Sequence, residues 1–222
     1  MNDFDADGPA LISLILTDPM VFPLVPPDQR NAVKMLWNLN NRLAEMAGAG
    51  KEPALRQIRL RWWADQLALT ANGTIPPEPL LAGVASGLTP LLGADGLAAL
   101  AESWMEQAAA DPEEDTPGEQ GAILFAPTAT LLGGGGDDPR IAAAGRLWAR
   151  VTARLGHDAT ASGDWSALAS EAAALSLTGL PKPLAVLAAL ARSVAKRHGQ
   201  RSWRRGAAAG ARCSRRRRWR LV

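Results

Sequence analysis

The chain has 222 residues, of which 47% are hydrophobic and 21% are charged, the balance of an ordinary folded domain. This length allows one sizeable core but is short for two full domains. Cys213 is the only cysteine, which excludes a scaffold held together by disulfides. His157 and His198 are the only histidines, so a Cys/His zinc cluster is excluded as well.

The net charge of +2 conceals two regions of opposite charge. Residues 192–222 contain 12 of the 24 Lys and Arg residues and no Asp or Glu. Residues 1–191 therefore hold 12 basic and 22 acidic residues, a net charge of −10. An acidic body repels nucleic acid, whereas a basic tail attracts it. Nucleic acid or an anionic membrane is therefore expected to bind only through the tail, residues 196–222.

The amino-terminal residues 1–7 are acidic and lack the basic start of a secretory signal peptide. No stretch approaches the roughly 18 consecutive apolar residues that a transmembrane helix needs. We therefore expect a cytoplasmic protein, with peripheral association with a membrane as an open alternative.

Apolar residues recur at three- and four-residue steps along residues 28–195, the pattern of amphipathic helices. The first predicted helix follows Asp28, which is expected to be its N-cap, and ends at Gly48 and Gly50. The second predicted helix begins at Pro53, a residue suited to the first turn. Its apolar stripe toward the core is expected to consist of Leu55, Ile58, Trp62 and Leu69, flanked by Trp63 and Leu67.

Trp62 and Trp63 are neighbours on this second helix and point about 100° apart. One is therefore expected in the core and the other at its margin. Further helical stripes are predicted at residues 80–91, 97–108, 123–131, 147–155, 165–175 and 184–190. The breaks between them fall at residues 93–95, 111–118, 133–138 and 179–181.

No period-two alternation indicates a strand. We therefore expect an all-α protein with about eight helices in one domain, residues 28–195. An extended N-terminal segment, residues 1–27, is expected before this domain. An Arg-rich tail, residues 196–222, is expected to be disordered after it.

Three short motifs have both a functional and a structural interpretation. The glycines at 133–136 could cradle a phosphate, but no strand precedes them and no Gly-Lys-Ser/Thr follows, which favours an interhelical loop. The acidic cluster at 111–115 could bind a divalent cation, but its spacing matches no metal loop and favours a solvated turn. His157 beside Asp158 lacks an accompanying nucleophile motif and is expected at the surface.

Two adjacent segments resemble the squalene/phytoene synthase family, especially its divergent bacterial and mitochondrial branch. Residues 36–46 read LWNLNNRLAEM and are similar to a family helix of the type L-Y-A-x-N-x-E-L-A. Residues 52–67 read EPALRQIRLRWWADQL and resemble E-P-x-L-x-x-I-R-L-x-W-W-R-D-x-L, the more specific of the two matches. The resemblance extends more weakly through residues 78–191.

The resemblance implies an all-α, isoprenoid-synthase-like bundle that is shortened at its C-terminus relative to the family's enzymes. Those enzymes join two prenyl diphosphates head to head, with Mg²⁺ held between two aspartate-rich motifs. The first motif, D-D-x-x-D, falls on residues 44–48, where Glu45 alone has a carboxylate. The second region, residues 146–164, contains Asp158 and Asp164 but no two acids at positions i and i+4.

The degraded motifs leave two functions open. In the first, the chain is non-catalytic and needs no cofactor, and it binds an isoprenoid or lipid ligand, or a partner protein. An assembly factor for respiratory complex I in the same branch is the precedent for the partner-protein role. In the second, the chain is an active Mg²⁺-dependent prenyltransferase of isoprenoid biosynthesis.

The resemblance also implies candidate site residues. Glu45 is a possible residual metal ligand. Arg56, Arg59 and Arg61 are candidate diphosphate or anion contacts, with a solvated helix face as the alternative. The candidate cavity lining consists of Trp37, Asn41, Trp62 and Trp63.

The tail also has two interpretations. Residues 200–222 have no apolar stripe and are dominated by Arg, Gly, Ala and Ser. They are either a basic arm that binds nucleic acid or an anionic membrane, or the product of GC-rich codons translated in a shifted reading frame.

Overall fold

The computed structural model describes residues 18–48, 52–109, 118–157 and 165–218, with the backbone alone at 156–157 and 201–218. Within these ranges the chain forms α-helices and two short 3-10 helices and contains no strand, which confirms the all-α prediction. None of these helices is long and apolar enough to cross a membrane.

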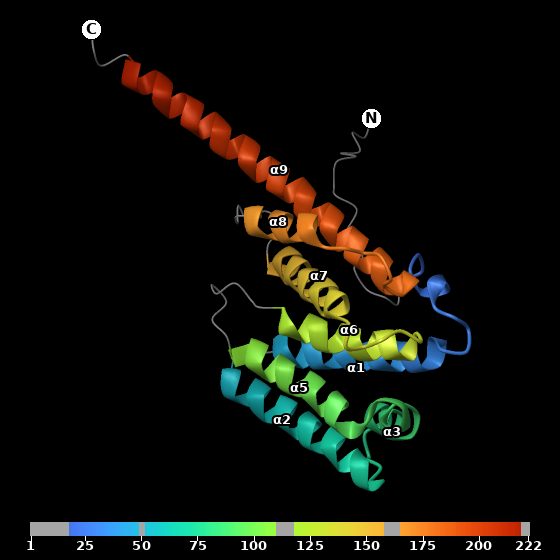
Figure 1. Cartoon of the computed structure of the whole chain (residues 1–222). Helices are drawn as coiled ribbons and strands as arrows, with labels where there is room; N and C mark the ends of the chain where they lie inside the picture. Colours follow the sequence, from blue (N-terminus) through green and yellow to red (C-terminus); the bar gives the residue numbers. More distant parts are fainter. Residues whose placement is uncertain (1–17, 49–51, 110–117, 158–164, 219–222) are drawn as a thin grey trace, which may run out of the picture.

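The elements follow one another along the chain as Figure 1 labels them. They are η1 (Phe22–Leu24), α1 (Arg30–Gly48), α2 (Pro53–Leu69), η2 (Thr70–Asn72), α3 (Pro79–Gly87), α4 (Thr89–Leu92), α5 (Ala94–Ala109), α6 (Glu119–Leu131), α7 (Pro139–His157), α8 (Ser166–Ala174) and α9 (Lys182–Arg218).

The helices are stacked in layers (Figure 1). Helices α2 and α5 pack against each other at one end of the stack, and α1 and α6 form the layer beside them. Helix α7 packs on the far side of α6, and α8 and α9 complete the opposite end. Helix α2 is therefore an outermost helix of the bundle, with one side turned away from every layer.

An aromatic cluster joins the middle layers. Trp37 of α1 is fully buried and packs against Phe125 of α6 and Trp148 of α7, with ring centroids 6.3 and 5.4 Å away. The Trp37 indole Nε1 donates a hydrogen bond to the Thr128 hydroxyl at 3.1 Å. Thr128 in turn donates to the carbonyl oxygen of Leu124 at 2.7 Å. The buried indole and hydroxyl both have partners, as buried polar groups require.

Helices α6 and α7 cross with their backbones almost in contact. A Cβ atom at Gly121 would lie 2.1 Å from the carbonyl oxygen of Gly145, and a Cβ atom at Gly145 would lie 2.3 Å from that of Gly121. These obstructing atoms belong to the main chain, so only a displacement of a whole helix could make room. The crossing therefore depends on glycine at both positions.

Some helix boundaries differ from the predicted ones. Helix α1 begins at Arg30, and Asp28, which we expected to be the N-cap, lies in the turn before it. The helix predicted over residues 80–91 is two helices, α3 and α4, with a turn at Leu88. Pro90 accounts for this break, since proline has no backbone N–H to bond to the carbonyl oxygen four residues earlier and fits the first turn of a new helix. The extra break gives nine α-helices in the described ranges instead of about eight.

Both ends of the described chain contain helical residues outside the domain expected at residues 28–195. The segment that we expected to be extended contains η1, which contacts α9, and Val21 and Val25 beside it are buried. The tail that we expected to be disordered after residue 195 continues α9 as far as Arg218. Alanine and arginine are both strong helix formers, so a helix can continue here without an apolar stripe.

Candidate functional site

Glu45, the candidate metal ligand, lies on the exposed side of α1. Its carboxylate accepts a hydrogen bond from Arg42 Nη1 at 3.2 Å, and its side chain is 67% exposed. The described residues contain no group of three or more His, Cys, Asp or Glu side chains placed to hold a metal ion. Asp158, Asp164, the acidic cluster at 111–115 and the His157 side chain lie outside the described part of the chain.

The four candidate cavity residues do not share one environment. Trp37 belongs to the aromatic cluster with Phe125 and Trp148, and Asn41 is half-buried on the same helix. Trp63 is buried, whereas its neighbour Trp62 is 43% exposed. One of these two tryptophans enters the core, as predicted, whereas Trp62 lies on the exposed side of α2 and not at the margin of the core.

The three candidate anion contacts are spread around α2. Arg59 and Arg61 are exposed, and Arg56 is half-buried. Arg61 forms an ion pair with Asp65 at 3.0 Å. Residues two apart on a helix point about 200° apart, so Arg59 and Arg61 lie on opposite flanks of the exposed side of α2.

The stripe of α2 that we expected in the core is its exposed side. The exposed fractions of Leu55, Ile58, Trp62 and Leu69 are 47%, 65%, 43% and 42%. The residues that face the core are instead Leu60, Trp63, Ala64 and Leu67. The prediction was therefore wrong about which side of this helix is buried.

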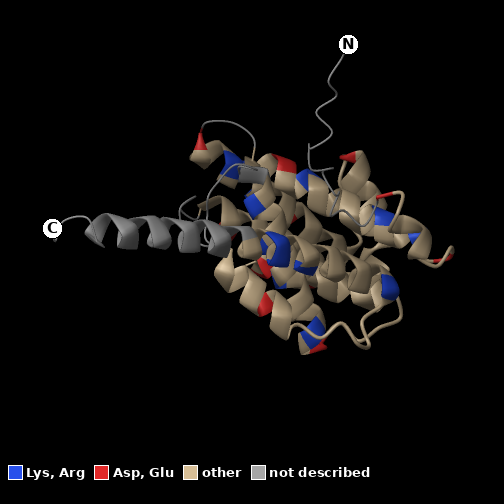
Figure 2. Cartoon of the chain, turned by 90° about the horizontal axis from the view of Figure 1, so that it is seen from above, with Lys and Arg blue, Asp and Glu red and all other residues tan. Residues whose placement is uncertain are grey.

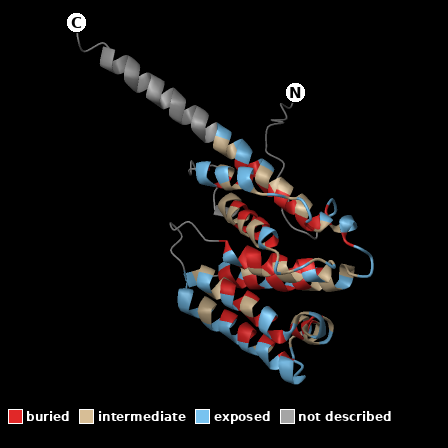
Figure 3. Cartoon of the chain, in the orientation of Figure 1, coloured by how far each residue is buried: buried red, intermediate tan, exposed pale blue. Residues whose placement is uncertain are grey.

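The correction has a physical reason. Helix α2 is apolar on two sides, and its spacing alone cannot say which side a neighbour covers. The neighbour is α5, and the Gln57 side chain fixes the contact by donating from Nε2 to the carbonyl oxygen of Met105 at 2.9 Å. Figure 3 shows the side of α2 away from the bundle as exposed.

We call Leu55, Ile58, Trp62 and Leu69 the α2 outer face. Leu55, Trp62 and Leu69 are spaced by seven residues, close to two helical turns, so they lie nearly in line along the helix. Charged side chains flank this line, Arg59 on one side and the Arg61–Asp65 pair on the other. Elsewhere the described Lys, Arg, Asp and Glu residues are scattered over the surface of the bundle (Figure 2).

A concave feature lies between α7 and α8. It is a cavity of about 360 Å³ lined by Pro139, Arg140, Ala143, Leu147, Glu171, Ala174, Leu175 and Ser176. Its two ionisable residues already have partners, since Glu171 pairs with Arg150 and Arg140 pairs with Asp138.

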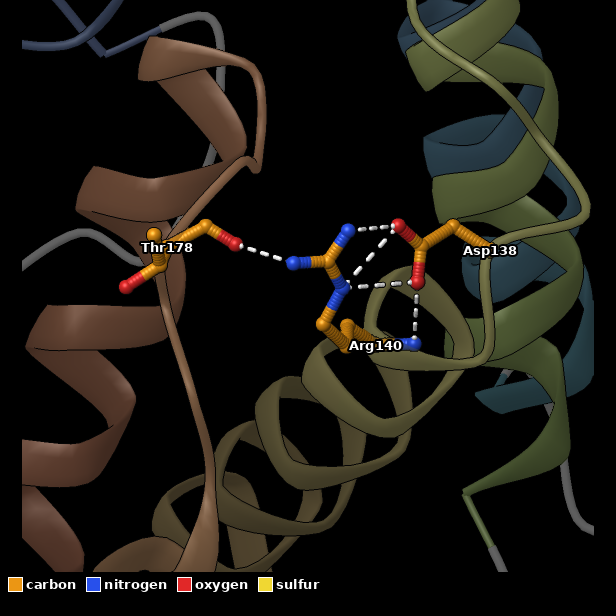
Figure 4. Close-up of polar contacts among 3 residues, drawn as sticks. All are labelled: Asp138, Arg140 and Thr178. Atoms are coloured by element: carbon orange, nitrogen blue, oxygen red, sulfur yellow. Dashed lines mark hydrogen bonds and ion pairs between the residues drawn. The ribbon is translucent and has the colours of Figure 1, made fainter.

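Arg140 ties together two segments that border this cavity (Figure 4). Asp138 accepts hydrogen bonds from the Arg140 backbone N–H at 2.8 Å and from its Nε at 3.0 Å. Nη1 of Arg140 donates to the Thr178 carbonyl oxygen at 2.7 Å. The hydrogen bond from the Arg140 side chain lowers the pKa of the Asp138 carboxyl, which keeps it ionised as the cap of α7. We interpret these contacts as a structural brace between α7 and the loop after α8.

Part of this brace, the cap of α7 by Asp138, is indicated by the sequence. Asp138 directly before Pro139 is the pattern of an N-cap followed by the first helical residue, so the start of α7 could have been predicted. The bond to Thr178 could not, because it joins residues 38 positions apart.

Comparisons with protein-family models, with curated proteins and with solved structures found no match for this chain. The resemblance to the squalene/phytoene synthase family therefore stays a prediction that rests chiefly on residues 36–67.

Proposed function

We propose that this chain is a binding protein that packs its α2 outer face against a helix of a partner protein. The observation that carries the proposal is one stripe of four large apolar side chains that are 42–65% exposed. Helix α2 is apolar on two sides, and among the described residues only one of them is covered. Exposed, contiguous apolar patches mark interaction sites. This role is the non-catalytic function with a partner protein, one of the alternatives that the resemblance leaves open.

The arrangement of the α2 outer face favours a helical partner. Leu55, Ile58 and Trp62 recur at steps of three and four residues, the spacing by which one helix packs its side chains against another. Trp62 lies at the centre of the stripe, and tryptophan is enriched among residues that dominate binding energy. Arg59 and Arg61 supply the polar rim that surrounds the apolar centre of an interface.

The lipid-ligand and prenyltransferase alternatives have less support in the geometry. The interior beside Trp37 is filled by Phe125 and Trp148, whose ring centroids lie 5.5 Å apart. Glu45 is paired with Arg42 at the surface. The α2 outer face, by contrast, presents apolar surface that has no covering element among the described residues.

Photo-cross-linking in the cells that produce the chain tests this proposal. A benzophenone amino acid replaces Ile58 on the α2 outer face, and in a matched control it replaces Ser170, an exposed residue of α8. We expect a discrete protein adduct from position 58 and none from position 170, because only the first lies where a partner helix packs. Adding Trp62→Glu should abolish the adduct, since a buried carboxylate at the centre opposes packing.

Two results would contradict the proposal. The first is no protein adduct from position 58, or equal adducts from both positions. The second is flotation of the purified chain with vesicles of phosphatidylcholine and phosphatidylglycerol that is lost in Ile58→Glu. That result would assign the α2 outer face to a lipid surface.

A further inference from the structure

The two leucines of the α2 outer face are symmetric about Trp62, whereas the position that mirrors Ile58 is Gln66. Leu55 and Leu69 each lie seven residues from Trp62, one toward each end of the helix. A second α2 helix that lies antiparallel across this face, with a two-fold axis at Trp62, would place each of these leucines opposite the other. Trp62 would then meet its own equivalent at the axis.

The charged residues Arg61 and Asp65 beside the stripe also match their copies under the two-fold axis at Trp62. At about 1.5 Å of rise per residue, Arg61 lies about 1.5 Å from the axis and Asp65 about 4.5 Å from it in the opposite direction. The two-fold operation brings Asp65 of the second copy to within about 3 Å of Arg61 along the helix axis, on the same flank. Both side chains are more than half exposed, at 63% and 56%, so they are accessible to such a partner.

The other flank is complementary as well. Arg59 and Gln66 lie three residues before and four residues after Trp62 on this flank. The same axis places Gln66 of the second copy within about 1.5 Å of Arg59 along the helix axis. A guanidinium donor then faces an amide oxygen acceptor. Both flanks of the stripe therefore match their own antiparallel copy.

We infer that the partner of the α2 outer face is a second copy of this chain, bound through antiparallel α2 helices with the two-fold axis at Trp62. This inference rests on the proposed function and specifies its partner. The interface is isologous, so each apolar or charged contact occurs twice. Apolar packing supplies the affinity, and the Arg61–Asp65 contacts set the antiparallel register.

A charge-swap experiment tests the inference on the purified full chain by sedimentation equilibrium. The unmodified chain should sediment as a dimer. Arg61→Asp and Asp65→Arg should each raise the dissociation constant at least about tenfold, because like charges then meet twice across the axis. An equimolar mixture of the two variants should dimerise like the unmodified chain. In that mixture one copy offers only carboxylates at the two positions and the other only guanidiniums.

The matched control is Arg42→Asp on α1, which also breaks an exposed ion pair, with Glu45, but lies away from α2. It should leave the dissociation constant unchanged, and circular dichroism should show every variant helical. A mixture that dimerises no better than either variant alone would overturn the antiparallel register. A dimer insensitive to both substitutions would overturn the α2 interface itself.

The two proposals fail in distinguishable ways. An unmodified chain that stays monomeric, with a cross-linked adduct from position 58 of a mass other than a second copy, would overturn the inference and leave the proposed function standing. A monomeric chain that gives no protein adduct from position 58 would overturn both.

Discussion

Gly145→Ala should lower the free energy of unfolding by about 3 kcal/mol, at the upper end of the usual cost of overpacking a core. The added methyl would lie 2.3 Å from the carbonyl oxygen of Gly121 on α6, so α6 and α7 must move apart. Gly121→Ala should act in the same direction, since its methyl would lie 2.1 Å from the carbonyl oxygen of Gly145. Chemical denaturation followed by circular dichroism measures both effects.

Gly96→Ala is the matched control for these substitutions. Gly96 lies inside α5, and a Cβ atom there would have no heavy atom within 4 Å. Because alanine is the better helix former, this variant should gain up to about 1 kcal/mol. If Gly145→Ala proved as harmless as Gly96→Ala, the close crossing of α6 and α7 would be wrong.

Trp37→Ala should lower the free energy of unfolding by about 3–5 kcal/mol, the usual cost of removing a large aromatic residue from a core. The variant leaves a cavity between Phe125 and Trp148 and removes the indole that donates to the Thr128 hydroxyl. Chemical denaturation again gives the value. Three helices of the bundle, α1, α6 and α7, meet at this one side chain, so its loss affects the whole unfolding transition.

Met20→Ala provides the comparison for Trp37→Ala, because Met20 is a large apolar side chain that is 86% exposed. Its removal should change the free energy of unfolding by no more than about 0.5 kcal/mol. A loss of less than about 1 kcal/mol in Trp37→Ala would contradict the placement of this residue at the centre of the core.

Much of the fold could be predicted because its signals are local. Glycines and prolines mark the ends of helices, and Gly48 and Pro53 are the last residue of α1 and the first of α2 as expected. The four glycines at 133–136 form the loop between α6 and α7, as predicted. Three- and four-residue spacing indicates a helix whichever side of it is buried.

The candidate site could not be predicted because it depends on which side of α2 is covered. Helix α5 covers that side, and its Met105, whose carbonyl oxygen bonds to Gln57, lies 48 residues after Gln57 in the sequence. One local signal does exist, at Asp65. The spacing that joins Leu55, Ile58, Trp62 and Leu69 requires an apolar residue near position 65, and the charge there indicates solvent. The side centred on Leu60, Ala64 and Leu67 has no charged residue between positions 60 and 67, and its polar residues, Arg56 and Gln57, lie at its N-terminal end.

The tail shows the limit of the apolar pattern as a predictor. The absence of a stripe after residue 196 led us to expect no regular structure, yet α9 continues to Arg218. An apolar stripe indicates that a helix packs against something, whereas the helix itself depends on the intrinsic preference of its residues. Alanine and arginine satisfy that preference without providing a packing face.

The most direct measurement of the central claim is radical oxidation of the adjacent residues Trp62 and Trp63, resolved by tandem mass spectrometry. In purified protein diluted until it is monomeric, Trp62 should be oxidised and Trp63 protected, since their exposed fractions in the single chain are 43% and 4%. Inside cells both should be protected, because a partner then covers the α2 outer face. Equal protection of both residues in the monomeric protein, or equal oxidation of Trp62 in both conditions, would contradict the claim that this face is a binding surface.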